Sequence, residues 1–165
     1  MPIVKTIVGS IPELFKEGKV PSLLANPTNC QKVMKGLGKE LEEEFHIINE
    51  VDHGFPLPAE YRIGDYSAVR LGEQATILNF YVIMEPDGHF EYSALKSCLK
   101  KLSNEAVAAG TYIQLTFPLI TPSEYGVKWE IVKRILDTQE NLLITVVQHD
   151  KRQISMGEGE TDSAS

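Results

Sequence analysis

Residues 22–38 read S-L-L-A-N-P-T-N-C-Q-K-V-M-K-G-L-G, an apolar run, a polar break and the start of a helical pattern. Ser22–Ala25 predicts a short strand, and the break Asn26–Asn29 ends it. A helix over about 35–49 follows, because its apolar residues recur every three or four positions. A strand that leads into a helix is the building unit of α/β sheets.

The same alternation continues on both sides of this stretch. Ser10 is placed as the N-cap of a helix that opens at Ile11, and Gly110 ends a later helix. The segment 51–62 contains Gly54, Pro56 and Pro58 and predicts a loop. The other predicted elements are strands at 3–8, 66–71, 76–84, 112–117 and 142–148 and helices at 92–109 and 124–136. This order predicts an α/β sheet with helices on both faces.

The composition argues against several classes of protein. The 165 residues carry 16 Lys and Arg against 23 Asp and Glu, a net charge of −7, which argues against general nucleic-acid binding. Two cysteines, Cys30 and Cys98, do not form a metal or disulfide pattern, and no apolar run reaches the length of a membrane span. We expect one domain over 1–150, a polar disordered tail over 151–165, and a cytoplasmic location.

Three strand-to-helix corners are candidates for a ligand site. They are 9–11, 26–38 and 118–129, where backbone amides would face the crevice beyond the carboxyl ends of the strands. Such amides suit a phosphate or pyrophosphate, and Lys32, Lys35 and Lys128 would not repel one. Spacing alone is equally consistent with ordinary connections.

Five segments, in order along the chain, resemble macro domains. They are V-G-S-I-P-E-L at 8–14, L-A-N-P-T-N-C-Q at 24–31 with its continuation to Leu37, G-H-F-E-Y-S-A-L at 88–95, the span from Pro118 to Val132, and L-I-T-V-V at 143–147. The resemblance covers about residues 3–150. It implies a three-layer α/β/α sandwich with a mixed, mostly parallel sheet. It also implies binding of ADP-ribose or a related sugar nucleotide, with hydrolysis of ADP-ribose 1″-phosphate as a possible reaction.

The resemblance also implies site residues. Asn29 takes the position that commonly contacts the distal ribose. Glu124 lies near the position of an Asp that members cleaving side-chain esters use, although no Asp is in register here. Asn29 could instead cap the coming turn, and Glu124 could simply favour the first turn of a helix. The ligand-binding positions carried over are Gly9, Ser10, Ile11, Asn26, Gln31, Val33, Met34, Gly36, Ile120, Thr121, Ser123, Tyr125 and His149. No cofactor is implied.

The chain departs from the family pattern at three places. Ser10 replaces the Asp that accepts a hydrogen bond from adenine, so a charge-assisted bond becomes a neutral one. Lys32 replaces a glycine of the first phosphate loop, and Thr121-Pro122-Ser123 replaces Gly-x-Gly in the second. The alternative hypothesis is therefore a degenerate, non-catalytic macro fold that recognises an altered nucleotide signal or a protein partner.

The remaining candidates are histidines and one tryptophan. His149 follows the last strand, where stacking against adenine is plausible, and His53 is either an acid or base or an exposed loop residue. No histidine pair has metal-ligand spacing, so no metal site is predicted. Trp129 shares an apolar helix face with Val132 and Leu136 and is expected in the core.

Overall fold

The computed structural model describes residues 2–31, 36–54, 58–86, 88–121 and 125–150. Within these residues the chain forms six strands and six helices, one of which, α4, is a single short turn before β3. The strands are β1 (Ile3–Gly9), β2 (Leu23–Asn29), β3 (Tyr66–Leu71), β4 (Ala75–Ile83), β5 (Ile113–Pro118) and β6 (Leu142–His149). The helices are α1 (Ile11–Lys16), α2 (Leu37–Glu44), α3 (Ile47–Gly54), α4 (Ala59–Arg62), α5 (Tyr92–Ala108) and α7 (Trp129–Asp137).

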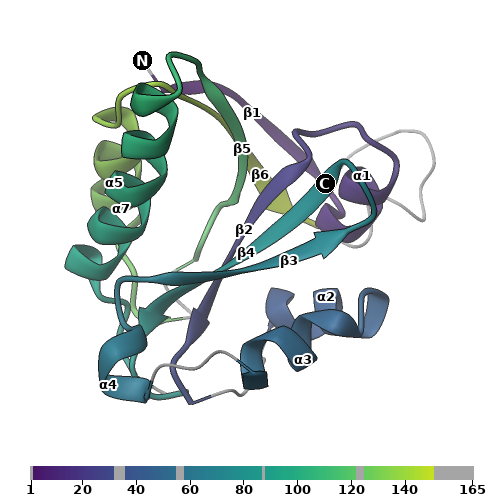
Figure 1. Ribbon diagram of the computed structural model, residues 1–165, viewed down its shortest axis with the longest axis vertical. Helices are drawn as coiled ribbons and strands as arrows, with labels where there is room; N and C mark the ends of the chain where they lie inside the picture. The colour runs from purple at the N-terminus through teal and green to yellow at the C-terminus, as the bar shows by residue number, and fades with distance from the viewer. Residues whose placement is uncertain (1, 32–35, 55–57, 87, 122–124, 151–165) are drawn as a thin grey trace.

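The strands form one sheet in the order β1-β6-β5-β2-β4-β3. Every neighbouring pair is parallel except β3 and β4, which form an antiparallel pair at one edge. Helices α5 and α7 lie on one side of the sheet, and α1, α2 and α3 lie on the other (Figure 1). The predicted three-layer α/β/α sandwich with a mixed, mostly parallel sheet is confirmed.

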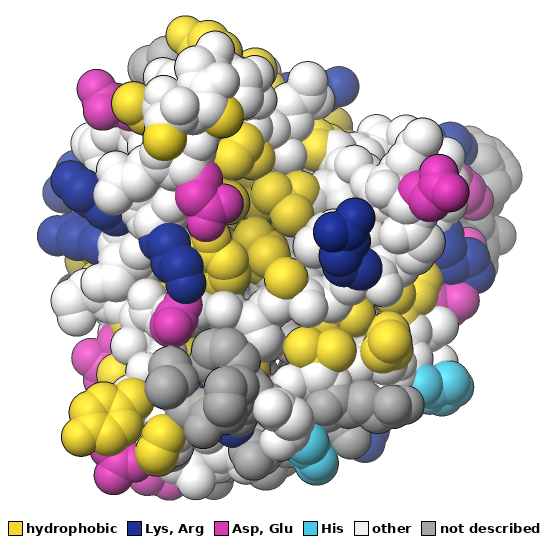
Figure 2. Space-filling view, viewed as in Figure 1, with side chains coloured by type: hydrophobic (Ala, Val, Ile, Leu, Met, Phe, Trp, Pro, Cys, Tyr) yellow, Lys and Arg dark blue, Asp and Glu magenta, His cyan; other side chains and the backbone are white. Residues whose placement is uncertain are grey.

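Each helical layer encloses its own hydrophobic core. One core joins α5 and α7 to the sheet through residues such as Leu95, Leu99 and Phe117. The other joins α1, α2 and α3 to the opposite face through Ile11, Leu41 and Ile48. Figure 2 shows hydrophobic side chains gathered between α5 and the sheet, with charged side chains on either side. Burial of apolar surface on both faces is what holds the layers together.

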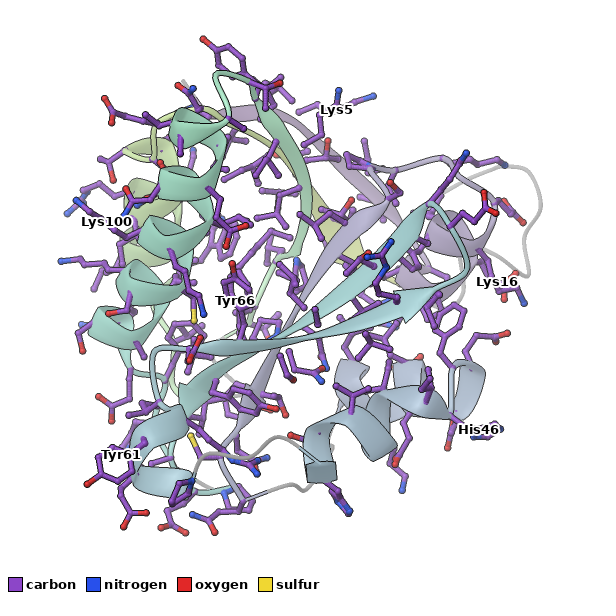
Figure 3. The ribbon with its side chains drawn as sticks, viewed as in Figure 1. Lys5, Lys16, His46, Tyr61, Tyr66 and Lys100 are labelled. Atoms are coloured by element: carbon purple, nitrogen blue, oxygen red, sulfur yellow. The ribbon has the colours of Figure 1, made fainter. Side chains whose placement is uncertain are left out.

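Tyr66 ties the edge strand β3 to helix α5. Its ring stacks on Phe80 with centroids 5.6 Å apart, and its hydroxyl donates to Glu105 at 2.9 Å. The side chain lies between β3 and α5 in Figure 3. Burial raises the pKa of Tyr66, and the neighbouring Glu105 carboxylate adds to that rise.

The prediction of one helix over 35–49 and a loop over 51–62 is wrong. The chain breaks at Phe45 (φ −131°, ψ 82°), and α3 then runs on to Gly54. Phe45 leaves the helical path to pack edge-to-face on Phe15, with ring centroids 6.0 Å apart. Pro58 is the N-cap of the short helix α4 rather than part of a long loop. Helices α3 and α4 are short and are separated by Gly and Pro residues, so neither shows a clear helical period in the sequence.

The predicted end of the second strand at Ala25 is also wrong. Strand β2 continues through Asn26 and Pro27 to Asn29, parallel to β4 along its whole length. The polar residues that suggested a break are paired and buried within the sheet. None of the helices in the described part of the chain is both long and apolar enough to cross a bilayer.

Candidate functional site

A cavity of about 320 Å³ opens at the carboxyl ends of β2, β5 and β6. Three segments far apart in the sequence form its walls: β2, the beginning of α2, and the residues after β5 together with the end of β6. The lining residues are Asn26, Pro27, Gly36, Leu37, Gly38, Glu40, Pro118, Leu119, Ile120, Thr121, Tyr125, Gln148 and His149. Ligand crevices of open α/β sheets lie at this edge.

The cavity forms where β2 and β5 part. The two strands pair at Leu24 and Thr116. Beyond this pair each strand carries a proline, Pro27 in β2 and Pro118 in β5, and both prolines line the cavity. Proline has no amide hydrogen and cannot extend the ladder between them. The space between the two strands beyond this pair therefore belongs to the cavity.

Gly36 turns the chain into α2 at the opposite wall. It is the N-cap of α2 with a φ of +56°, a conformation that glycine adopts without strain. Leu37 and Gly38 then bring the first turn of the helix to the cavity. Because Gly36 and Gly38 have no side chains, a ligand can approach the backbone closely at these two residues.

His149 links the first corner to this cavity. Its Nδ1 accepts a hydrogen bond from the Ile11 amide at 3.1 Å. Its Nε2 lies 3.1 Å from both carboxylate oxygens of Glu40. Next to it the Asp150 amide donates to the Gly9 carbonyl at 3.0 Å. The corner at 9–11 therefore joins the cavity through the imidazole ring.

Asn26 is held in the cavity wall by a buried hydrogen-bond chain. Its Nδ2 donates to Asn79 Oδ1 at 2.9 Å, and Asn79 Nδ2 donates to Ser67 Oγ at 3.2 Å. Ser67 and Tyr81 share a hydrogen bond of 2.9 Å between their hydroxyls. The neighbours in this chain lie on adjacent strands, since Asn79 is in register with both Asn26 and Ser67.

This series of hydrogen bonds ends at a buried ion pair between Asp52 and Arg62. Tyr81 donates to Asp52 Oδ1 at 2.7 Å, and Arg62 Nη1 lies 3.6 Å from the same oxygen. Arg62 also donates to the Asp52 carbonyl at 3.3 Å, and its guanidinium lies 5.6 Å from the centroid of the Tyr81 ring. Asp52 and Arg62 are 0% and 2% exposed. Helices α3 and α4 are thus linked to the wall of the cavity.

Asn29 and Gln31 lie at the end of β2, outside the residues that line the cavity. Asn29 is buried, and its Oδ1 accepts a hydrogen bond from the Gln31 amide at 3.0 Å. Gln31 Nε2 in turn donates to the Met84 carbonyl at 3.3 Å. This is an Asx turn, so Asn29 has the turn-capping geometry that the sequence suggested as one of its two possible roles.

Six of the sequence-predicted site residues line the cavity, namely Asn26, Gly36, Ile120, Thr121, Tyr125 and His149. Gly9, Ser10 and Ile11 adjoin it through His149. Ser10 is the N-cap of α1, as expected, although its side chain makes no capping hydrogen bond. Val33, Met34, Ser123 and Glu124 lie outside the described residues, as do Lys32, Lys35 and Pro122.

The sequence interpretation missed Glu40 and Gln148. Glu40 lies one turn after Gly36, so helical spacing from that glycine was the signal that could have found it. Gln148 precedes His149 in β6 and lines the cavity with it. Helical spacing from Gly36 could have identified Glu40, but only the tertiary structure shows that His149 of β6 contacts it.

Other candidates lie away from the cavity lining. His53 lies in the last turn of α3 and is exposed. Trp129, expected in the core, is partly buried against it and packs on Phe117 with ring centroids 6.5 Å apart. Burial raises the pKa of the Cys30 thiol to about 11, although Arg62 acts in the opposite direction. A thiol that is protonated at neutral pH is a poor nucleophile. Within the described ranges, no three His, Cys, Asp or Glu side chains are grouped as a metal site.

Sequence comparison finds a relative in Enterobacteria phage T4, an uncharacterized 17.5 kDa protein from the tk-vs intergenic region. The two are 32% identical over 157 residues, which cover 88% of this chain and 95% of the phage protein. The chain belongs to the family of this phage T4 protein. No protein-family model matches it.

Solved structures identify the fold of this family member. A macrodomain protein from Streptomyces coelicolor has a TM-score of 0.66 at 13% identity and covers 88% of this chain and 99% of its own. The macrodomain of Mycobacterium tuberculosis DarG has a TM-score of 0.59 at 17% identity, with coverages of 79% and 90%. Thermosipho africanus DarTG in complex with ADP-ribose has a TM-score of 0.63 at 16% identity, with coverages of 86% and 40%. The chain is a divergent macrodomain in fold, as the resemblance implied.

Proposed function

We propose that the cavity binds ADP-ribose or a closely related sugar nucleotide. The observation that carries the proposal is the meeting of three strand-to-helix corners at one cavity of about 320 Å³. Small-molecule sites have volumes of roughly 300–1,000 Å³ and combine apolar walls with a few polar groups. Leu37, Leu119 and Ile120 supply apolar walls here, and Asn26 and Glu40 supply polar groups.

The fold and the motifs favour this class of ligand over others. Thermosipho africanus DarTG, 40% of which matches this fold, is a complex with ADP-ribose. The segment L-A-N-P-T-N-C-Q, which resembles a macro-domain motif, forms most of β2 and the turn after it, at the wall of the cavity. The glycine conformation at Gly36 gives the close backbone approach that a diphosphate requires.

Calorimetric titration with ADP-ribose tests the proposal. We expect saturable heat with one site per chain, because the lining surrounds a single cavity. Thr121→Trp places an indole at the exposed rim of the cavity and should weaken binding at least tenfold, whereas the exposed His46→Ala should not. No heat at millimolar ADP-ribose with folded protein would contradict the proposal.

Ser10→Asp tests the base end of the proposed site. The substitution restores a charged acceptor beside the Ile11 amide, and aspartate is also a favoured N-cap. We expect ADP-ribose to bind about 1 kcal/mol more tightly, the net contribution of roughly one hydrogen bond. The same titration measures it. An unchanged or weaker affinity would mean that the adenine does not lie beside residue 10.

We propose hydrolysis of ADP-ribose 1″-phosphate as the reaction, with Asn29 in contact with the distal ribose. The motif N-C-Q-x-V-M that begins at Asn29 favours this reaction within the macrodomain fold. The alternative is a non-catalytic protein that recognises a nucleotide signal or a protein partner. Release of inorganic phosphate from ADP-ribose 1″-phosphate distinguishes the two.

A further inference from the structure

The cavity wall carries a carboxylate and an imidazole in direct contact. Glu40 belongs to the first turn of α2, and both of its carboxylate oxygens lie 3.1 Å from His149 Nε2. The two side chains are 27% and 19% exposed, so they are accessible from the cavity. Among the described residues that line it, Glu40 is the only one of the Asp, Glu, Lys and Arg types.

The hydrogen bond to Ile11 fixes the role of each ring nitrogen. A backbone amide can only donate, so His149 Nδ1 accepts from Ile11 N–H and carries no proton. In the neutral ring the proton is then on Nε2, which donates to Glu40. His149 therefore orients the Glu40 carboxylate from the end of β6, while Glu40 itself comes from α2.

A carboxylate in this position selects for hydrogen-bond donors. Its two oxygens offer about four lone-pair sites, so it accepts a donor from a ligand in addition to His149. A phosphate placed beside it would be repelled, and the cost is greater in a partly buried cavity than in water. A nucleotide in this cavity would consequently place its phosphates away from Glu40 and a donor-bearing group beside it.

We propose that Glu40 determines base specificity by accepting a hydrogen bond from an exocyclic amino group, and that His149 is its positioning residue. The inference rests on the proposed function, since it concerns which base the same cavity admits. Glu40 supplies from α2 a carboxylate at the end of the cavity where His149 joins the β1–α1 corner, whose Ser10 is neutral and buried.

Paired titrations with ADP-ribose and its deaminated inosine counterpart test the role of Glu40. The two ligands differ in an amino group against a keto oxygen. We expect the wild type to bind ADP-ribose at least tenfold more tightly than the inosine counterpart, since a carboxylate accepts a hydrogen bond from the amino group and repels the keto oxygen. In Glu40→Gln this ratio of affinities should fall to about threefold or less, because the amide can donate to the keto group. Glu40→Ala should lower it as well.

Glu43→Gln is the matched control, because it removes an exposed carboxylate from the same helix. Its affinity ratio should equal that of the wild type. An equal loss of discrimination in this variant would overturn direct contact with Glu40 and indicate a general charge effect.

The role of His149 is tested by a pair of variants. His149→Ala removes the donor to Glu40 and should lower the affinity ratio at least threefold. His149→Gln retains a side-chain N–H at similar reach and should restore most of the ratio, which a merely structural role would not produce. A wild-type ratio in His149→Ala would overturn the positioning role.

The outcomes separate this inference from the function on which it rests. If ADP-ribose binds and the ratio is near one in the wild type, or unchanged in Glu40→Gln, the specificity role is overturned and the proposed function stands. If neither ligand binds the wild type or Glu40→Gln, both are overturned.

Discussion

Arg62→Met is expected to lower the free energy of unfolding by about 3–5 kcal/mol. Arg62 is 2% exposed and lies 3.6 Å from the fully buried Asp52 carboxylate. Methionine fills much of the same volume, so the loss comes from leaving a buried carboxylate without its cationic neighbour. Urea denaturation monitored by circular dichroism measures the change.

Two variants separate this charge effect from packing. Asp52→Asn combined with Arg62→Met removes both charges and should recover most of the lost stability. Arg70→Met removes an exposed arginine from β3 and should alter stability by less than about 0.5 kcal/mol. An Arg62→Met protein within 1 kcal/mol of the wild type would show that the pair is not a major support of α3 and α4.

Asn29→Ala is expected to lower kcat/KM for ADP-ribose 1″-phosphate by about a hundredfold or more. Under the proposed function, Asn29 positions the distal ribose, and loss of a positioning contact has effects on this scale. Phosphate release under steady-state conditions measures it, with the melting temperature as the check on folding.

Asn29→Asp distinguishes the ligand role from the turn role. Aspartate keeps an oxygen that can accept the Gln31 amide hydrogen bond, but it has no amide donor. We expect this variant to fold as the wild type does and to lose turnover as Asn29→Ala does. Full activity in Asn29→Asp would assign Asn29 to the turn alone.

The sequence predicted the strands and the layers well, because their signals are local. Apolar runs such as 76–84 and the spacing of Leu95, Leu99 and Leu102 are set by which face each residue buries. The break at Phe45 could not be read in this way, since it depends on a contact with Phe15, thirty residues earlier. Short helices separated by Gly and Pro also leave too few turns for a period.

The candidate site likewise has one part with a local sequence signal and one part that depends on tertiary contacts. Strand ends predicted the segments 26–38 and 118–129 as candidates, because ligand crevices follow from α/β topology. The resemblance to macro domains then implied Asn26, Gly36 and Ile120, which line the cavity. The engagement of the Ile11 amide by His149, and of His149 by Glu40, joins three segments that lie far apart in the sequence. No spacing rule predicts such a contact. It requires the register of β1 against β6, in which Gly9 pairs with His149.

A ¹⁵N-¹H NMR titration with ADP-ribose tests most directly whether these corners form one nucleotide-binding cavity. We expect saturable shifts concentrated on the amides of Gly36, Gly38, Ile120 and His149, with the amides of α5 and α7 unaffected. Shifts that map to the α5 and α7 face, or no shifts at millimolar ligand, would contradict it.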